Sequence, residues 1–74
     1  MALPTLSLGA TGQQVRILQS LLIVAANDLM HEKNIDGDFG PYTQSSLKTW
    51  QGRTNSLTAD GVAGPKTWRW LIGA

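Results

Sequence analysis

The sequence contains no cysteine, so neither a disulfide nor a cysteine-ligated metal can hold this chain together. Its 74 residues lie near the lower size at which one apolar core supports a fold, and they predict a single domain over 1–74. Three Trp, one Tyr and one Phe provide apolar surface, because each large aromatic side chain can bury about 150–250 Å². The hydrophobic core alone is therefore expected to stabilise the fold.

The chain also lacks a long apolar run and a cluster of basic residues. Its longest uncharged apolar run, 21–26, is far shorter than the roughly 20 residues that span a bilayer, so no membrane partner is expected. The six Lys and Arg residues are scattered singly and the net charge is +1, which argues against nucleic acid as a partner. The first residues lack the basic and then apolar pattern of a secretory signal, so export would use another route or another part of the protein.

Side chains that perform catalysis are few. The chain has one His and five carboxylates, and two of the carboxylates, Asp36 and Asp60, belong to predicted turns. His31 has no HExxH-like companion, which favours a surface or capping role. Asp28 and Glu32 are four residues apart, which is typical of a like-charged helical pair rather than of glycosidase acids. The sequence therefore predicts a non-catalytic chain without a cofactor.

A calcium-binding loop is an alternative interpretation of the residues around the first Asp-Gly pair. Glu32, Asn34 and Asp36 fall at positions one, three and five of an EF-hand-like or dockerin-like loop. Position twelve, however, is Thr43 instead of a bidentate Glu, and a Gly-Pro pair interrupts the loop. We therefore expect no metal ligands in the chain and keep a calcium-dependent module as a weaker hypothesis.

An internal repeat organises the second half of the chain. Residues 36–43 recur as 60–67, an offset of 60 − 36 = 24 residues, with Asp-Gly, Gly-Pro and Thr in the same places. Asp-Gly supplies a tight turn, and Pro is tolerated at the first position of a helix. Each copy is thus predicted to be a turn that leads into a helix, with the helices beginning at Pro41 and Pro65.

A further helix is predicted before the repeat. Thr11-Gly12-Gln13-Gln14 matches a capping box, and apolar residues at spacings of three, four and seven continue to Leu29. Arg16, Gln19 and Ser20 share the narrow polar side, which is expected to face water or a ligand.

The three helices predict an all-α fold, a small three-helix bundle with two Asp-Gly turn-helix repeats. Both repeat helices are expected to pack against the first helix, which makes it the centre of the bundle. The residues expected to face the core outside the first helix are Leu6, Leu8, Thr43, Leu47, Trp50, Trp68, Leu71 and Ile72.

Three groups of short motifs follow one another: Leu8-Gly9, Gly12, Val15, Leu18-Gln19 and Leu22; Asp36-Gly37, Phe39-Gly40, Thr43 and Trp50-Gln51; and Asp60-Gly61, Gly64, Thr67-Trp68 and Leu71. In this order they resemble the three-helix peptidoglycan-binding domain found beside cell-wall amidases, muramidases, carboxypeptidases and phage endolysins. The chain departs from that pattern in a longer segment over 25–35 and in a Trp where Phe is more common.

The resemblance implies non-catalytic binding of bacterial peptidoglycan, at the cell wall or in the periplasm. It further implies a monomer tethered to a wall hydrolase, such as the catalytic domain of an endolysin. Similar three-helix domains also precede secreted metalloenzymes, so a protein-interaction or propeptide-like module is the alternative.

The first Asp-Gly turn is the predicted ligand site, because a carboxylate, an aromatic ring and a phenol lie close together in it.

Trp70 is about 200° around the helix from Trp68 and is expected to be partly exposed, where it can stack on a ligand. Two glutamines, Gln19 and Gln51, can bond either to loop backbone or to ligand amides, and the sequence leaves both roles open. The predicted ligand-binding set is Gln19, Asp36, Asp38, Phe39, Tyr42, Thr43 and Trp70, with Phe39 also favoured as a core residue. The second turn is expected to be architectural.

Overall fold

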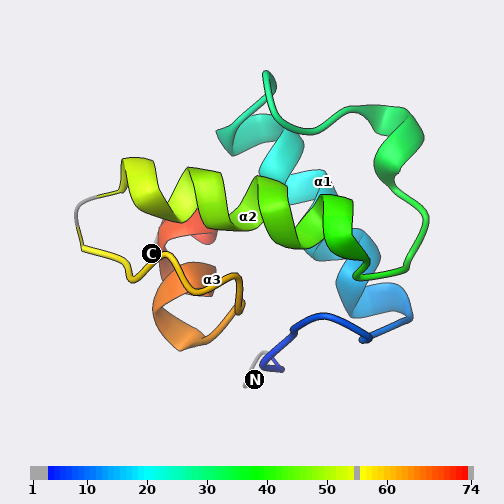
Figure 1. The fold of residues 1–74 in the computed structure, drawn as a ribbon, viewed down its shortest axis with the longest axis horizontal. Coiled ribbons are helices and arrows are strands. Elements are labelled where there is room, and N and C mark those ends of the chain that lie inside the picture. Colours follow the sequence, from blue (N-terminus) through cyan, green and yellow to red (C-terminus); the bar gives the residue numbers. More distant parts are fainter. Residues whose placement is uncertain (1–3, 55, 74) are drawn as a thin grey trace.

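The computed structural model describes residues 4–54 and 56–73. Three α-helices follow one another, α1 (Gln13–Ala25), α2 (Pro41–Arg53) and α3 (Pro65–Ile72), with a short 3-10 helix η1 (Glu32–Asn34) between α1 and α2. Both α2 and α3 contact α1, and Figure 1 shows α2 crossing in front of it. The predicted all-α, three-helix fold is confirmed. None of the helices in the described ranges is long and apolar enough to cross a bilayer.

The helices α2 and α3 begin where the sequence predicted, at Pro41 and Pro65. The residues before them, Gly40 and Gly64, have nearly the same backbone angles, φ −95° and ψ −173° in the first and φ −94° and ψ −172° in the second. A proline at the first helical position loses no hydrogen bond, because that N–H has no partner within a helix. The two turn-helix junctions are therefore built in the same way.

The helix α1 begins differently from the prediction. No side chain caps it, so the expected capping box of Thr11 and Gln14 is wrong, and the capping residue is Gly12. Gly12 has φ +113°, a conformation that favours glycine, and its N–H donates to the carbonyl of Gly37 at 2.9 Å. This hydrogen bond to the first Asp-Gly turn fixes the start of α1, in place of the side-chain cap that was predicted.

The helix α1 also ends earlier than predicted, at Ala25 rather than near Leu29. The chain leaves the helix at Ala26, whose carbonyl accepts hydrogen bonds from the N–H groups of Leu29 (2.9 Å) and Met30 (3.2 Å). Asn27 and Asp28 follow, and both residue types compete with helical hydrogen bonding. This turn brings the side chain of Met30 into the core, where it is fully buried.

One apolar core lies between α1 and the two repeat helices. Its buried members are Leu6, Val15, Leu18, Leu22, Ala26, Met30, Phe39, Leu47, Trp50, Ala63 and Trp68. The buried positions of Trp50 and Trp68 confirm the predicted stripes, and the indole N–H of Trp68 donates to the Pro4 carbonyl at 2.7 Å. Two predicted core residues, Leu8 and Ile72, are instead each 53% exposed.

The segment before α1 joins the two Asp-Gly turns. Leu6 pairs with Ala63 in the second turn through two hydrogen bonds, of 3.1 and 2.8 Å. Gly9 and Ala10 pair with Phe39 in the first turn, at 2.9 and 2.8 Å. Between these pairs the chain makes a turn, which directs Leu8 to solvent, although Leu8 was predicted to face the core together with Leu6. One backbone segment thus holds both turns in place.

Candidate functional site

A buried glutamine of α1 holds the first Asp-Gly turn. The Oε1 atom of Gln19 accepts hydrogen bonds from the backbone N–H groups of Asp36 and Gly37, each at 3.1 Å. Its Nε2 atom lies 3.0 Å from Asp36 Oδ1, 3.0 Å from Thr43 Oγ1 and 3.1 Å from the Asp38 carbonyl oxygen. The Gln19 side chain has no exposed surface, so the prediction that it faces water or a ligand is wrong. Its task is to fix the turn.

The carboxylate of Asp36 is part of the same network. Its Oδ1 atom accepts from Gln19 and from the backbone N–H of Asp38 at 3.0 Å. These hydrogen bonds to the charged form, with a smaller attraction from Arg16, lower the pKa of Asp36 below its ordinary value. The turn is therefore built around an ionised carboxylate.

The second turn has the same construction with Gln51 of α2 in the place of Gln19. Its Oε1 atom accepts from the Gly61 N–H at 2.9 Å, and its Nε2 atom donates to the Val62 carbonyl at 2.9 Å and the Thr67 hydroxyl at 3.1 Å. Asp60 Oδ1 accepts from the Val62 N–H at 2.9 Å, as Asp36 accepts from Asp38. For both glutamines, the structure shows the backbone role that the sequence had left open.

An open groove with a volume of about 310 Å³ lies against the first turn. We call it the first loop groove, and it is lined by Asn34, Asp36, Asp38, Gly40, Pro41, Tyr42 and Thr43. Both carboxylates are exposed, and the side chain of Tyr42 is 53% exposed. The groove thus brings together Asp36, Asp38 and Tyr42 of the predicted site, whereas the ring of Phe39, which that prediction also included, is buried in the core.

Tyr42 also lines a smaller hollow of about 220 Å³, together with Asp28, Leu29, Ser45, Ser46 and Thr49. The hydroxyl groups of Tyr42 and Ser46 donate to the same Leu29 carbonyl, at 2.9 and 3.0 Å. The segment between α1 and α2 is thereby tied to α2. Tyr42 thus lines two hollows, and the sequence did not predict the smaller one because part of its lining comes from Asp28 and Leu29, which precede α2.

The carboxylate of Asp28 is engaged by Arg53 at the end of α2. The two guanidinium nitrogens lie 3.0 and 2.8 Å from the two carboxylate oxygens. This bidentate contact lowers the pKa of Asp28 and raises that of Arg53. Asp28 is therefore an ion-pair residue, and not a member of the like-charged helical pair that the sequence predicted.

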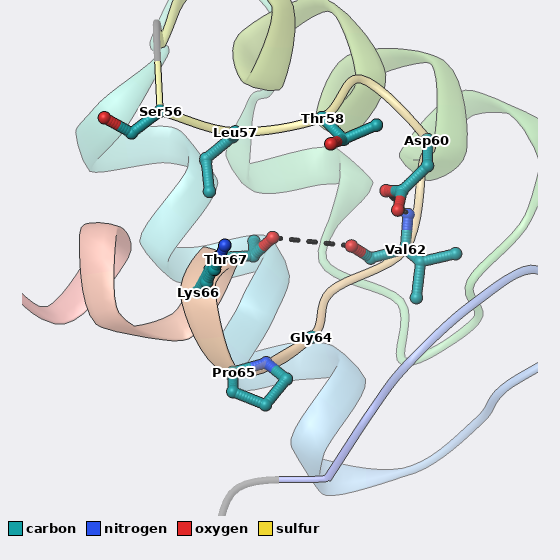
Figure 2. Close-up of a pocket in the computed structure, with 9 residues that line it drawn as sticks. All are labelled: Ser56, Leu57, Thr58, Asp60, Val62, Gly64, Pro65, Lys66 and Thr67. Atoms are coloured by element: carbon teal, nitrogen blue, oxygen red, sulfur yellow. Dashed lines mark hydrogen bonds between the residues drawn. The ribbon is translucent and has the colours of Figure 1, made fainter.

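Another groove, of about 370 Å³, lies against the second turn. Figure 2 shows its two sides, the connector of Ser56, Leu57 and Thr58 facing the start of α3, with Leu57 projecting towards Thr67. We call it the second loop groove. The sequence had assigned this turn to architecture alone, although the 24-residue repeat was a signal that a groove at one turn should recur at the other.

The predicted site residues thus fall into three groups. Asp36, Asp38 and Tyr42 come together at the surface of the first loop groove. Gln19, Phe39 and Thr43 are buried, at 0%, 2% and 3% exposure, and their side chains hold the turn from inside. The side chain of Trp70 is 52% exposed, which confirms its predicted partial exposure. It lies on α3, however, and does not line the first loop groove.

Comparison with known proteins gives the family. The model of the peptidoglycan binding domain family matches residues 11–71, which includes all three helices nearly to the end of α3. The chain belongs to the peptidoglycan-binding domain family. A search of curated proteins finds no match to the chain.

Solved structures agree with this assignment. The domain resembles the Burkholderia AP3 phage endolysin at 41% identity and a TM-score of 0.79, over 92% of this chain and 24% of the endolysin. It resembles the SleB N-terminal domain at 33% identity and a TM-score of 0.83, over 99% of this chain and 94% of that one. A peptidoglycan-binding protein from Clostridioides difficile, solved with glutamine hydroxamate, matches at 29% identity and a TM-score of 0.78, over 93% of this chain and 40% of that protein. The domain therefore spans about a quarter of the endolysin that it resembles.

The domain is a peptidoglycan-binding module. Within residues 4–54 and 56–73, no three His, Asp or Glu side chains converge where they could hold a metal ion. The chemistry that its surface offers is hydrogen bonding, charge and aromatic contact, and all three are present at the first loop groove.

Proposed function

We propose that this chain, as one monomeric module over 1–74, holds an attached cell-wall hydrolase on bacterial peptidoglycan. The family match over residues 11–71 carries the proposal, and the likeness to an endolysin supports the nature of the attached enzyme. Tethering to an insoluble polymer raises the effective concentration of a catalytic domain near its substrate, so weak binding by the module is enough.

The proposed contact surface is the first loop groove with the ring of Tyr42. Peptidoglycan offers sugar faces, amides and charged groups of its stem peptides. The exposed face of Tyr42 suits apolar atoms of such a ligand, and Asp36 and Asp38 suit its amide and ammonium donors. The fixed geometry of the turn lowers the entropy that binding would cost, because Gln19 holds the backbone in place before the ligand arrives.

The experiment is co-sedimentation of the isolated chain with purified peptidoglycan sacculi. We expect the chain to pellet with sacculi, and Tyr42→Ala to weaken binding about 3- to 10-fold through loss of an exposed aromatic contact. Val24→Ala is the matched control, because Val24 is an apolar side chain on α1 that is 85% exposed and far from the groove in sequence. A chain that stays in the supernatant, as an inert protein of similar charge does, refutes wall binding. Equal loss in both variants refutes the placement at Tyr42.

A further inference from the structure

The two loop grooves are equivalent positions of one repeated unit. Asp36, Gly40 and Thr43 of the first correspond to Asp60, Gly64 and Thr67 of the second at the same 24-residue offset. The glycines of the two Asp-Gly pairs have φ +76° and +73°. The second groove therefore lies against a turn of the same type, whose glycine N–H is bound by a glutamine as in the first.

The grooves differ in charge at two equivalent positions. Asp38 and Tyr42 of the first correspond to Val62 and Lys66 of the second. The first thus has two carboxylates and no cation among its lining residues, whereas the second has one carboxylate and an ammonium. Over the described ranges the ion pair that forms is Asp28 with Arg53, so Lys66 makes no salt bridge there.

Apolar side chains share the second loop groove with Lys66. Leu57 and Val62 line the groove with it, and Figure 2 shows them on the connector and on the second turn. Trp70 follows Lys66 by four residues on α3, so it lies on the same helix face one turn further on, and its side chain is 52% exposed. A groove that combines an ammonium with apolar side chains, with an exposed indole one helical turn further on, suits a ligand that joins a carboxylate to an apolar or sugar portion.

We infer that the second loop groove is a second binding site, which takes a carboxylate-bearing part of the wall peptide through Lys66. Two sites of unlike charge on one small domain would contact two parts of the same polymer, and their combined binding would exceed that of either. This inference rests on the proposed wall-binding function. It adds the second loop groove as a site, a carboxylate as the ligand group and Lys66 as the residue that binds it.

The test is a residue-resolved NMR titration of the chain with two probes, a synthetic stem peptide with a free terminal carboxylate and the same peptide as its terminal amide. We expect the free acid to shift the amides of Thr58, Val62 and Lys66, and the terminal amide to bind there about 3- to 10-fold more weakly, because a charge-assisted hydrogen bond is lost. The variant Lys66→Gln should weaken the shifts at this groove to a similar degree and leave those of Asp38 and Tyr42 in place. Lys48→Gln, which changes an exposed lysine of α2, is the matched control.

The outcomes separate the two proposals. Shifts at the first groove alone, or second-groove shifts that are the same in Lys66→Gln and in the unaltered chain, overturn the second site and leave wall binding intact. If neither groove responds and the chain does not pellet with sacculi, the proposed function fails and the second site fails with it. A dispersed amide spectrum of each variant shows that the domain remains folded.

Discussion

Gln19 of α1 and Gln51 of α2 hold two different turns through equivalent contacts, to which Gln19 adds two with Asp36. Each accepts a hydrogen bond from the glycine of an Asp-Gly pair, Gly37 or Gly61, at 3.1 and 2.9 Å. Each also donates to the hydroxyl of the threonine that follows in the next helix. The domain is thus a duplicated glutamine, turn and helix, and the duplication explains why two grooves exist in so short a chain.

Replacing Gln19 should destabilise the domain strongly. The variant Gln19→Leu leaves the buried N–H of Gly37 and the N–H of Asp36 without their acceptor, and we expect the free energy of unfolding to fall by about 2–4 kcal/mol. Gln14→Leu, at an exposed position of the same helix, should change it by no more than about 0.5 kcal/mol. Urea denaturation of the variants measures both values. Similar stabilities for the two variants would show that Gln19 does not hold the turn.

The glycine of the first turn is needed for its conformation. Gly37 has φ +76°, and a Cβ atom added there would lie 3.1 Å from the Nε atom of Arg16. We expect Gly37→Ala to lower the free energy of unfolding by about 1–2 kcal/mol. In the control Gly52→Ala, the change lies within α2, and among the described residues its Cβ would meet Ala59 alone, at 3.9 Å, so stability should stay the same or rise by up to about 1 kcal/mol. A Gly37→Ala domain as stable as the unaltered one would contradict the role given to this turn.

The ionised form of Asp36 should make stability depend on pH. Its pKa is lowered in the folded domain, chiefly by the hydrogen bond from Gln19, from an ordinary value of 3.8. A lowered folded-state pKa stabilises the domain above the unfolded-state pKa, and this stabilisation disappears as the pH falls through the folded-state value. The unaltered domain should therefore exceed Asp36→Asn in stability at pH 6, and the difference should shrink below pH 3.8.

Denaturant unfolding of both chains between pH 2.5 and 6 checks this expectation. Asp28 also has a lowered pKa and contributes acid sensitivity of the same sign, but it does so in both chains and cancels in the comparison. A difference between the two chains that is the same at pH 3 as at pH 6 would mean that the ionisation of Asp36 is not linked to folding.

The elements that depend on nearby residues were predictable from the sequence. The Asp-Gly turns and the helix starts at Pro41 and Pro65 are local features, and both appear where they were predicted. The helix α1 begins at Gln13, within the predicted motif, but its cap was not predictable in this way, because Gly12 donates a hydrogen bond to Gly37, 25 residues further on. The helix ends at Ala25 rather than near Leu29, because the chain turns there to bury the side chain of Met30 in the core.

The candidate site was predictable only in part, for a similar reason. A polar residue on a helix is expected at the surface, and that expectation failed for Gln19, because its hydrogen bonds are made to the first turn and to Thr43 of α2, inside the domain. Asp38 and Tyr42 lie in the first loop groove as predicted, since they follow the turn directly. The second loop groove was missed because its two walls come from a connector and a helix start, which only the fold brings together.

Hydroxyl-radical footprinting of the domain on purified sacculi tests most directly whether the wall is bound at the loop grooves. In the free domain Tyr42 and Trp70 are 53% and 52% exposed, and both should be oxidised readily. Bound to sacculi, Tyr42 should be protected about 3-fold or more by contact that excludes solvent, whereas Val24 on α1 should be oxidised as before. Protection of Val24 and Ile17 with Tyr42 unchanged would contradict the account, because it would place the wall on the exposed face of α1.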